Sequence, residues 1–152
     1  LKHVETHTFY KSALNVAIQQ GARSAVLQHL IQAAPNVLKI PDYNNESPLH
    51  VLVKHKPDDV ETVDAMLLHD PILASVPDAK GNLPLHTLVL SATDETGSQS
   101  VQIARRLSLA SQESIVHRNM NGLSPLELAE QNKSCPESLV KYLWKKVHRK
   151  KR

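Results

Sequence analysis

Two histidines, His50 and His86, are the residues whose type and position first suggest chemistry. An imidazole can bind a metal ion or transfer a proton near neutral pH. A metal site needs further ligands at suitable spacing, and the sequence shows none beside either histidine. Each histidine instead ends a Pro-Leu-His triplet, so the two occupy the same place in a repeated motif. The pattern therefore favours structural histidines over a metal or proton-transfer site.

The other reactive side chains lack partners that would make them catalytic. Cys135 is the single cysteine, so no disulfide can form within the chain, and no residue pattern supplies a base to activate its thiol. Glu127 and Glu130 follow Pro125 on a predicted helix and are better read as solvated helix charges than as an acid–base pair. No glycine-rich phosphate loop is present. We expect a non-catalytic protein with no metal, no cofactor and no small-molecule substrate.

Composition limits the kind of core that can position these residues. The 152 residues suit one domain, and 41% of them are hydrophobic while only 3% are aromatic. The core must then be aliphatic, which suits thin stacked layers. No apolar run is long enough to span a membrane, and no signal-peptide pattern opens the sequence. We expect an intracellular protein, cytoplasmic or nuclear.

Positive charge is concentrated at the C-terminal end. Six of the last eight residues, 145–152, are Lys or Arg, and without them the net charge changes from +3 to −3. This basic tail is consistent with nuclear import or with binding to nucleic acid or an acidic membrane surface. It is equally consistent with a solvated helix end, where cations are favoured. Both interpretations stay open at this point.

An internal repeat organises the rest of the chain. Three segments, 42–50, 78–86 and 119–127, each contain Asp or Asn, then Pro-Leu, and a weaker copy lies near residues 12–17. Asp and Asn can start a turn by bonding their own backbone, and Gly81, Gly122 and Asn45 follow where a reversal needs positive φ. Ser47 and Ser124 offer N-cap hydroxyls. The prolines that follow, at the first helical position, are Pro48, Pro84 and Pro125.

A second helix follows in each unit, with apolar residues at helical spacing. Examples are Leu27 with Ile31, Val63 with Met66, and Leu139 with Leu143. The expected fold is all-α, with about four helix-loop-helix units. A single unit cannot bury its apolar face alone, so the units must stack into a solenoid.

These motifs resemble the ankyrin repeat, whose signature is Asp-x-x-Gly-x-Thr-Pro-Leu-His-x-Ala. The segment Asp78 to His86 lacks only the threonine, which Leu83 replaces, and the segment at Asn119 has Glu127 in place of the histidine. The resemblance implies an ankyrin-type domain over residues 1–144, followed by the tail. It implies repeats near residues 9–41, 42–77, 78–118 and 119–144. The extra residues of the longer units fall at 56–59 and 93–98, which we expect to be projecting loops.

The resemblance also implies roles for residues. Each histidine should tie its own turn to the next one by hydrogen bonds. The turn tips and the exposed face of the first helices should line a concave groove that binds another protein. The predicted partner-binding residues are Tyr43, Asn44, Glu46, Lys54, Ala79, Lys80, Asn82, Met120, Asn121 and Leu123, with His55, Leu90, Ser91, Gln131 and Asn132 as further positions.

The leading interpretation is therefore a protein-interaction module or scaffold. The alternative is the same module with a basic tail that directs it to the nucleus, to nucleic acid or to an acidic membrane surface. Nucleic acid and membrane are expected as partners only through that tail.

Overall fold

The computed structural model describes residues 13–149, and over this range the chain is all-α, without a strand. Residues 13–19 are helical. The α-helices that follow are α2 (Ser24–Ala33), α3 (Pro48–His55), α4 (Val60–His69), α5 (Pro84–Ser91), α6 (Gly97–Ala110), α7 (Pro125–Gln131) and α8 (Glu137–His148). The short 3-10 helices are η1 (Pro35–Lys39), η2 (Pro71–Ser75), η3 (Asp94–Thr96) and η4 (Gln112–Ile115). The beginning of the predicted first repeat, 9–12, and Lys150, Lys151 and Arg152 of the tail lie outside the described residues.

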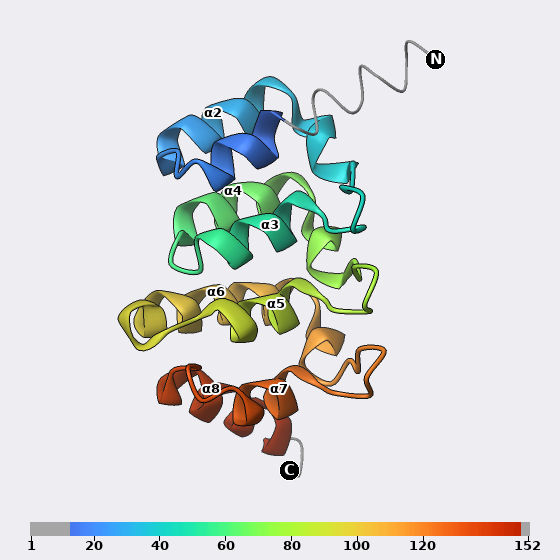
Figure 1. Ribbon diagram of the computed structural model, residues 1–152, viewed down its shortest axis with the longest axis vertical. Coiled ribbons are helices and arrows are strands. Elements are labelled where there is room, and N and C mark those ends of the chain that lie inside the picture. Colours follow the sequence, from blue (N-terminus) through green and yellow to red (C-terminus); the bar gives the residue numbers. More distant parts are fainter. Residues whose placement is uncertain (1–12, 150–152) are drawn as a thin grey trace.

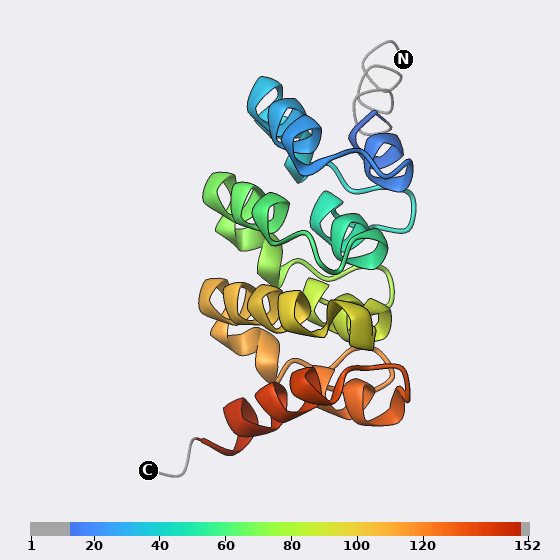
Figure 2. The same ribbon diagram turned by 90° about the vertical axis from the view of Figure 1, so that its left-hand side faces the viewer.

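The helices form two columns, which are clearest in Figure 2. Residues 13–19, α3, α5 and α7 make the first-helix column, in which α3 packs on α5 and α5 on α7. Helices α2, α4, α6 and α8 make the second-helix column, each contacting the next. The turns that precede α3, α5 and α7 project from one side of both columns (Figure 1). We call residues 42–46, 78–82 and 119–123 the turn tips.

The predicted helix starts are confirmed. The hydroxyl of Ser47 accepts a hydrogen bond from the amide of His50, and that of Ser124 accepts one from the amide of Glu127, both at 3.3 Å. A proline then occupies the first helical position of α3, α5 and α7, where no amide donor is needed. At the start of α5 the cap position holds Leu83, which has no side-chain oxygen and is buried instead.

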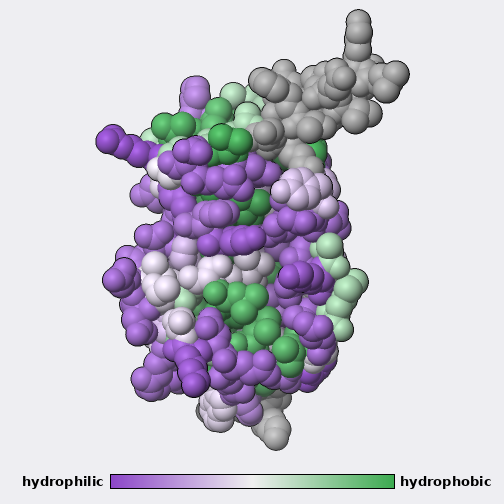
Figure 3. Space-filling view, in the orientation of Figure 1, coloured by the Kyte–Doolittle hydropathy of each residue, from purple (hydrophilic) through white to green (hydrophobic). Residues whose placement is uncertain are grey.

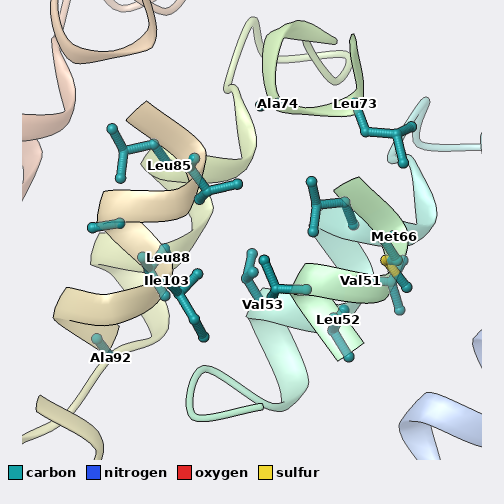
Figure 4. Close-up of a cluster of buried hydrophobic side chains, with 14 of the residues drawn as sticks. Val51, Leu52, Val53, Met66, Leu73, Ala74, Leu85, Leu88, Ala92 and Ile103 are labelled. Atoms are coloured by element: carbon teal, nitrogen blue, oxygen red, sulfur yellow. The ribbon is translucent and has the colours of Figure 1, made fainter. Parts of the chain in front are cut away.

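The core between the layers is aliphatic, as predicted. In the described residues the buried hydrophobic side chains are Leu, Ile, Val and Ala, with Met66 and Cys135 as the exceptions. Figure 4 shows side chains from α3, α4, α5 and α6 meeting in one cluster. Leu52, Leu85 and Ile103 in this cluster are fully buried. Each such side chain contributes about 1.5–3 kcal/mol by leaving water, so stabilisation is spread evenly through the layers.

Of the two segments expected to be projecting loops, 93–98 differs from that prediction and 56–59 does not. The segment 93–98 is largely wound, because η3 covers Asp94–Thr96 and α6 already begins at Gly97. The amide of Thr93 donates to Oγ1 of Thr96 at 3.0 Å, which closes this first turn. The segment 56–59 is a turn between α3 and α4, in which Asp58 is exposed while Asp59 is buried and its Oδ1 accepts from the amide of Thr62. The extra residues near 93–98 thus begin a longer helix, since α6 has 14 residues whereas α2 and α4 have 10 each, and Asp59 caps α4.

Candidate binding surface

One acidic or amide side chain organises each turn tip. Oδ1 of Asp42 accepts hydrogen bonds from the amides of Asn44 and Glu46, both at 2.9 Å. Asp78 and Asn119 make the equivalent two bonds to the amides two and four residues later. The residues that take positive φ in these turns are Asn45 at 58°, Gly81 at 76° and Gly122 at 75°. The predicted turn chemistry is confirmed in all three copies.

One histidine joins each turn tip to the next one: His50 joins the first tip to the second, and His86 joins the second to the third. The amide of Ser47 donates to Nδ1 of His50 at 3.1 Å, and the Nε2–H of the same ring donates to the carbonyl of Asn82 at 2.8 Å. The equivalent partners of His86 are the amide of Leu83, at 3.0 Å, and the carbonyl of Leu123, at 3.1 Å. The predicted role of these histidines as ties between turns is confirmed.

The environment of both rings keeps them neutral. Burial lowers the pKa of His50 and of His86 below the ordinary value of 6.5, although the backbone hydrogen bonds oppose this shift. Because Nδ1 accepts and Nε2 donates, each ring is the neutral tautomer protonated on Nε2. Both nitrogens are occupied by backbone groups, so neither ring offers a lone pair to a metal ion.

The backbones of the turn tips are also bonded to one another. The amide of Ala79 donates to the carbonyl of Asn44 at 3.2 Å, and the amide of Met120 donates to the carbonyl of Lys80 at 3.0 Å. A side-chain bond from Asn119 Nδ2 to Oδ1 of the buried Asn82, at 2.9 Å, reinforces the second contact. The three tips therefore form one continuous hydrogen-bonded row, which fixes their spacing.

A hollow of about 420 Å³ lies between the first two turn tips and helices α3 and α5. We call it the tip hollow. Figure 3 shows the face of the first-helix column, on which hydrophilic residues predominate and smaller hydrophobic patches lie between them. The residues lining the tip hollow are Asn44, Glu46, Lys54, Asp78, Ala79, Lys80, Asn82, Thr87, Leu90 and Ser91. Six of them are predicted partner-binding residues, and Leu90 and Ser91 are among the further positions.

The polar side chains of the tip hollow differ in whether they already form hydrogen bonds or ion pairs within the fold. Asp78 uses its carboxylate on the amides of its own turn, and the hydroxyl of Ser91 donates to the carbonyl of Thr87. Lys54 lies 3.8 Å from a carboxylate oxygen of Glu46, a loose ion pair in which the lysine is half-exposed and the glutamate is largely buried. Lys80 is exposed and forms no ion pair with any residue in the described range. Among the described residues that line the hollow, Lys80 is thus a cation without an ion-pair partner, and the apolar Leu90 is half-exposed.

The remaining predicted residues lie on the tips around the tip hollow. Tyr43 is 93% exposed and Met120 is 77% exposed, so both large side chains are open to a partner. Asn121 is exposed, whereas Leu123 is half-buried and its carbonyl accepts from His86. None of these four lines the hollow itself.

Two of the predicted positions are used within the fold. Asn82 lines the hollow, but its side chain is engaged by Asn119 and its carbonyl by His50. Asn132 donates from Nδ2 to the carbonyl of Val89 at 2.9 Å.

Sequence reasoning missed Asp78 and Thr87 as lining residues. Thr87 precedes Leu90 and Ser91 by three and four positions on α5, so helical spacing alone could have placed it on the same face.

The other reactive side chains have structural surroundings. Cys135 is buried, and burial raises the pKa of its thiol to about 11, which keeps it protonated and unreactive at neutral pH. Glu127 accepts from the amide of Ser124 and pairs with Arg118 at 2.9 Å, so it completes the cap of α7. Glu130 is exposed on the same helix.

The region 13–149 contains no group of three or more His, Cys, Asp or Glu side chains placed to hold a metal ion. Within that same stretch, no helix combines the length and apolar character needed to cross a membrane. Comparison with known proteins gives no matching family model and no matching curated protein.

Proposed function

We propose that this chain is an ankyrin-type repeat stack that binds a partner protein through its first-helix face and has no catalytic role. The observation that carries the proposal is the convergence of six of the ten predicted partner-binding positions on the tip hollow. Those positions come from two turns and one helix that are separated along the chain. They meet because the turns are bonded in register, so the lining is fixed before any partner arrives.

The repeated turn chemistry supports the family part of the proposal. The same side-chain-to-amide bonds, the same positive φ and the same histidine tie recur at one register of the repeat. Successive helices also pack in two columns, which is the arrangement that an ankyrin-type stack requires.

The size and chemistry of the surface favour a protein partner. A stable interface buries about 800 Å² on each side, more than a single small hollow supplies. The exposed Tyr43 and Met120 on the neighbouring tips extend the surface with side-chain types that interfaces favour. We propose that a partner segment places an acidic group near Lys80 and an apolar group on Leu90.

Affinity capture from a lysate of the source organism, using matched variants, tests this function. The hollow variant combines Lys80→Glu with Leu90→Ser, and the control combines Lys133→Glu with Leu68→Ser, both exposed and outside the hollow. Both variants carry the same changes in charge and side-chain type. We expect the hollow variant to retain less than about a tenth of the captured partner, and the control to retain nearly all of it. Equal capture by the two variants would overturn the proposal.

A further inference from the structure

A second surface feature lies on the opposite column, between α6 and α8. It is a hollow of about 480 Å³ lined by five cationic side chains together with Val101, Ser138 and Tyr142. The cationic residues are Arg105, Lys141, Lys145, Lys146 and Arg149. We call this feature the basic groove. It is separate from the tip hollow, with which it shares no residue.

Helix α8 positions most of these charges. It runs to His148, so the predicted boundary between domain and tail, after residue 144, falls inside the helix. Lys141, Lys145 and Arg149 follow one another at four-residue spacing and therefore share one face over about 12 Å. In the described part of the tail, residues 145–148 are helical and Val147 packs against the hydrophobic core.

Tyr142 fixes the groove to α6. Its hydroxyl lies 2.9 Å from Oγ of Ser108, and Arg105 and Lys146 lie 5.8 Å and 5.7 Å from the centre of its ring. Both cations are within the range of a cation–π contact. These contacts place Arg105 of α6 and Lys146 of α8 beside the same ring, so the charge cluster is organised before a ligand binds.

Very little negative charge offsets the cluster. Lys141 pairs with Glu137 at 3.1 Å, but both side chains are well exposed, so the pair is weak. In the described chain the other four cations form no ion pair. Cations are favoured near a helix C-terminus, which accounts for Lys145, Lys146 and Arg149. That effect does not account for Lys141 in the first half of α8, or for Arg105 on another helix.

The surroundings of the groove limit the size of a complementary anion. On the next helix, α4, Asp64 already pairs with Arg106 at 3.0 Å, and Glu61 is exposed. Helix α4, which packs on α6, thus adds two carboxylates and no lysine or arginine, which favours a compact anion over a long polyanion such as a nucleic acid. The aromatic rings are also occupied, since Tyr142 carries two cations and Trp144 stacks on His148 at 4.1 Å. Among the described residues of this region, both rings are already engaged by neighbouring side chains, which disfavours base stacking.

We propose that the basic groove binds a compact ligand that carries several phosphate groups. Arg105 supplies a planar donor pair suited to phosphate, while Lys141, Lys145, Lys146 and Arg149 surround it with further donors. The shared chemistry is a cluster of phosphates on a small scaffold, either free in solution or as the headgroup of a lipid.

Calorimetric titration of the full chain with inositol hexakisphosphate tests the proposal. The groove variant is Arg105→Gln with Lys145→Gln and Arg149→Gln. The control variant is Arg23→Gln with Lys39→Gln and Lys133→Gln, which removes the same charge at exposed positions outside both the basic groove and the tip hollow. We expect the groove variant to bind at least about tenfold more weakly than the intact chain, and the control variant to bind within about twofold of it. Circular dichroism of both variants checks that helix content is retained.

Two further titrations distinguish the sources of the phosphates. Phosphatidylcholine vesicles that contain phosphatidylinositol bisphosphate are compared with vesicles of phosphatidylcholine alone. Groove-dependent binding to the phosphorylated vesicles supports a headgroup, and binding confined to the soluble compound supports a free ligand. Duplex DNA is titrated in parallel with the same variants. The proposal is overturned if the two variants lose affinity equally, if neither inositol hexakisphosphate nor the phosphorylated vesicles bind, or if only duplex DNA binds in a groove-dependent way.

Discussion

The turn side of the molecule and the opposite side, where the two helices of each unit are connected, satisfy their backbone groups in different ways. On the turn side one register is used repeatedly, with Asp or Asn inside each turn and histidine between turns. On the connection side each tie is made by a different residue type. The ties are Lys56 Nζ to the carbonyl of Ala22 at 2.6 Å, Ser100 Oγ to that of Pro57 at 2.8 Å, and Asn132 Nδ2 to that of Val89 at 2.9 Å.

The difference shows where the repeat is constrained. The turn tips must keep one spacing, because each tip bonds to its neighbours through main-chain atoms. In the connections, any side-chain donor near an exposed backbone carbonyl is sufficient. The length and the residue types of the connections therefore vary. The tip hollow lies on the regular side, and the basic groove lies on the second-helix column, where residues change from unit to unit.

The largest expected effect comes from removing a histidine tie. His50→Ala leaves the amide of Ser47 and the carbonyl of Asn82 without their partner, and it opens a cavity at a fully buried site. We expect the free energy of unfolding to fall by about 2–4 kcal/mol in urea titration. His55→Ala, at an exposed position on the same helix, is the control and should change it by less than about 0.5 kcal/mol. Equal losses would show that the tie is not the source of stability.

Acid should lower the free energy of unfolding through the histidines of the turn side. The pKa values of His50 and His86 are lowered in the folded protein, whereas the unfolded chain binds protons near the ordinary value of 6.5. The free energy of unfolding is therefore fully retained above pH 6.5 and decreases as pH falls below it, because the unfolded state takes up more protons. Urea midpoints measured at several pH values in the double variant His50→Asn, His86→Asn should show a smaller decrease.

On the connection side, Asp59 provides the closest counterpart to a histidine tie. Its oxygens accept from Ser24, Thr62 and Lys56, and these bonds lower its pKa although burial alone would raise it. We expect Asp59→Ala to cost about 2–3 kcal/mol in the same urea assay, through the lost cap of α4 and the stranded lysine. The exposed neighbouring substitution, Asp58→Ala, should be nearly neutral. If Asp59→Ala left the free energy of unfolding unchanged, the connections would contribute little to stability.

Two glycines of the turn tips should differ in how much stability an alanine substitution costs. Gly81 and Gly122 have nearly the same positive φ, so alanine is strained at both. A methyl group at Gly81 would also lie 3.0 Å from the amide nitrogen of Met120, whereas one at Gly122 would meet nothing within 4 Å. We expect Gly81→Ala to cost about 1 kcal/mol more than Gly122→Ala in thermal or urea unfolding. The reverse order would contradict the close approach of the tips.

Local chemistry explains which parts of the structure could be predicted. Asn45, Gly81 and the prolines act through their own backbone, and their spacing revealed the turns and helix starts. The histidine ties followed from the family resemblance. The burial of Asn82 depends on His50 and Asn119, residues more than thirty positions away, and could not be read locally.

The connection side and the basic groove were harder to predict for the same reason. Lys56 bonds to Ala22, and Tyr142 bonds to Ser108, through pairs with no sequence signature. The domain boundary was therefore predicted after residue 144, although α8 continues to His148, and Lys145 and Lys146 line the basic groove together with Arg105. The winding of η3 likewise depends on side-chain bonds, such as that of Thr93 with Thr96, which composition did not indicate.

Photo-crosslinking tests most directly the claim that the first-helix face is the partner-binding surface. A photoreactive amino acid replaces Leu90 in the tip hollow in one protein and Leu68 on α4 in another; both are exposed leucines. Each is irradiated in a lysate of the source organism. The account predicts a specific protein adduct from position 90 and none from position 68. An adduct from position 68 and none from position 90 would contradict it and move the binding surface to the second-helix column.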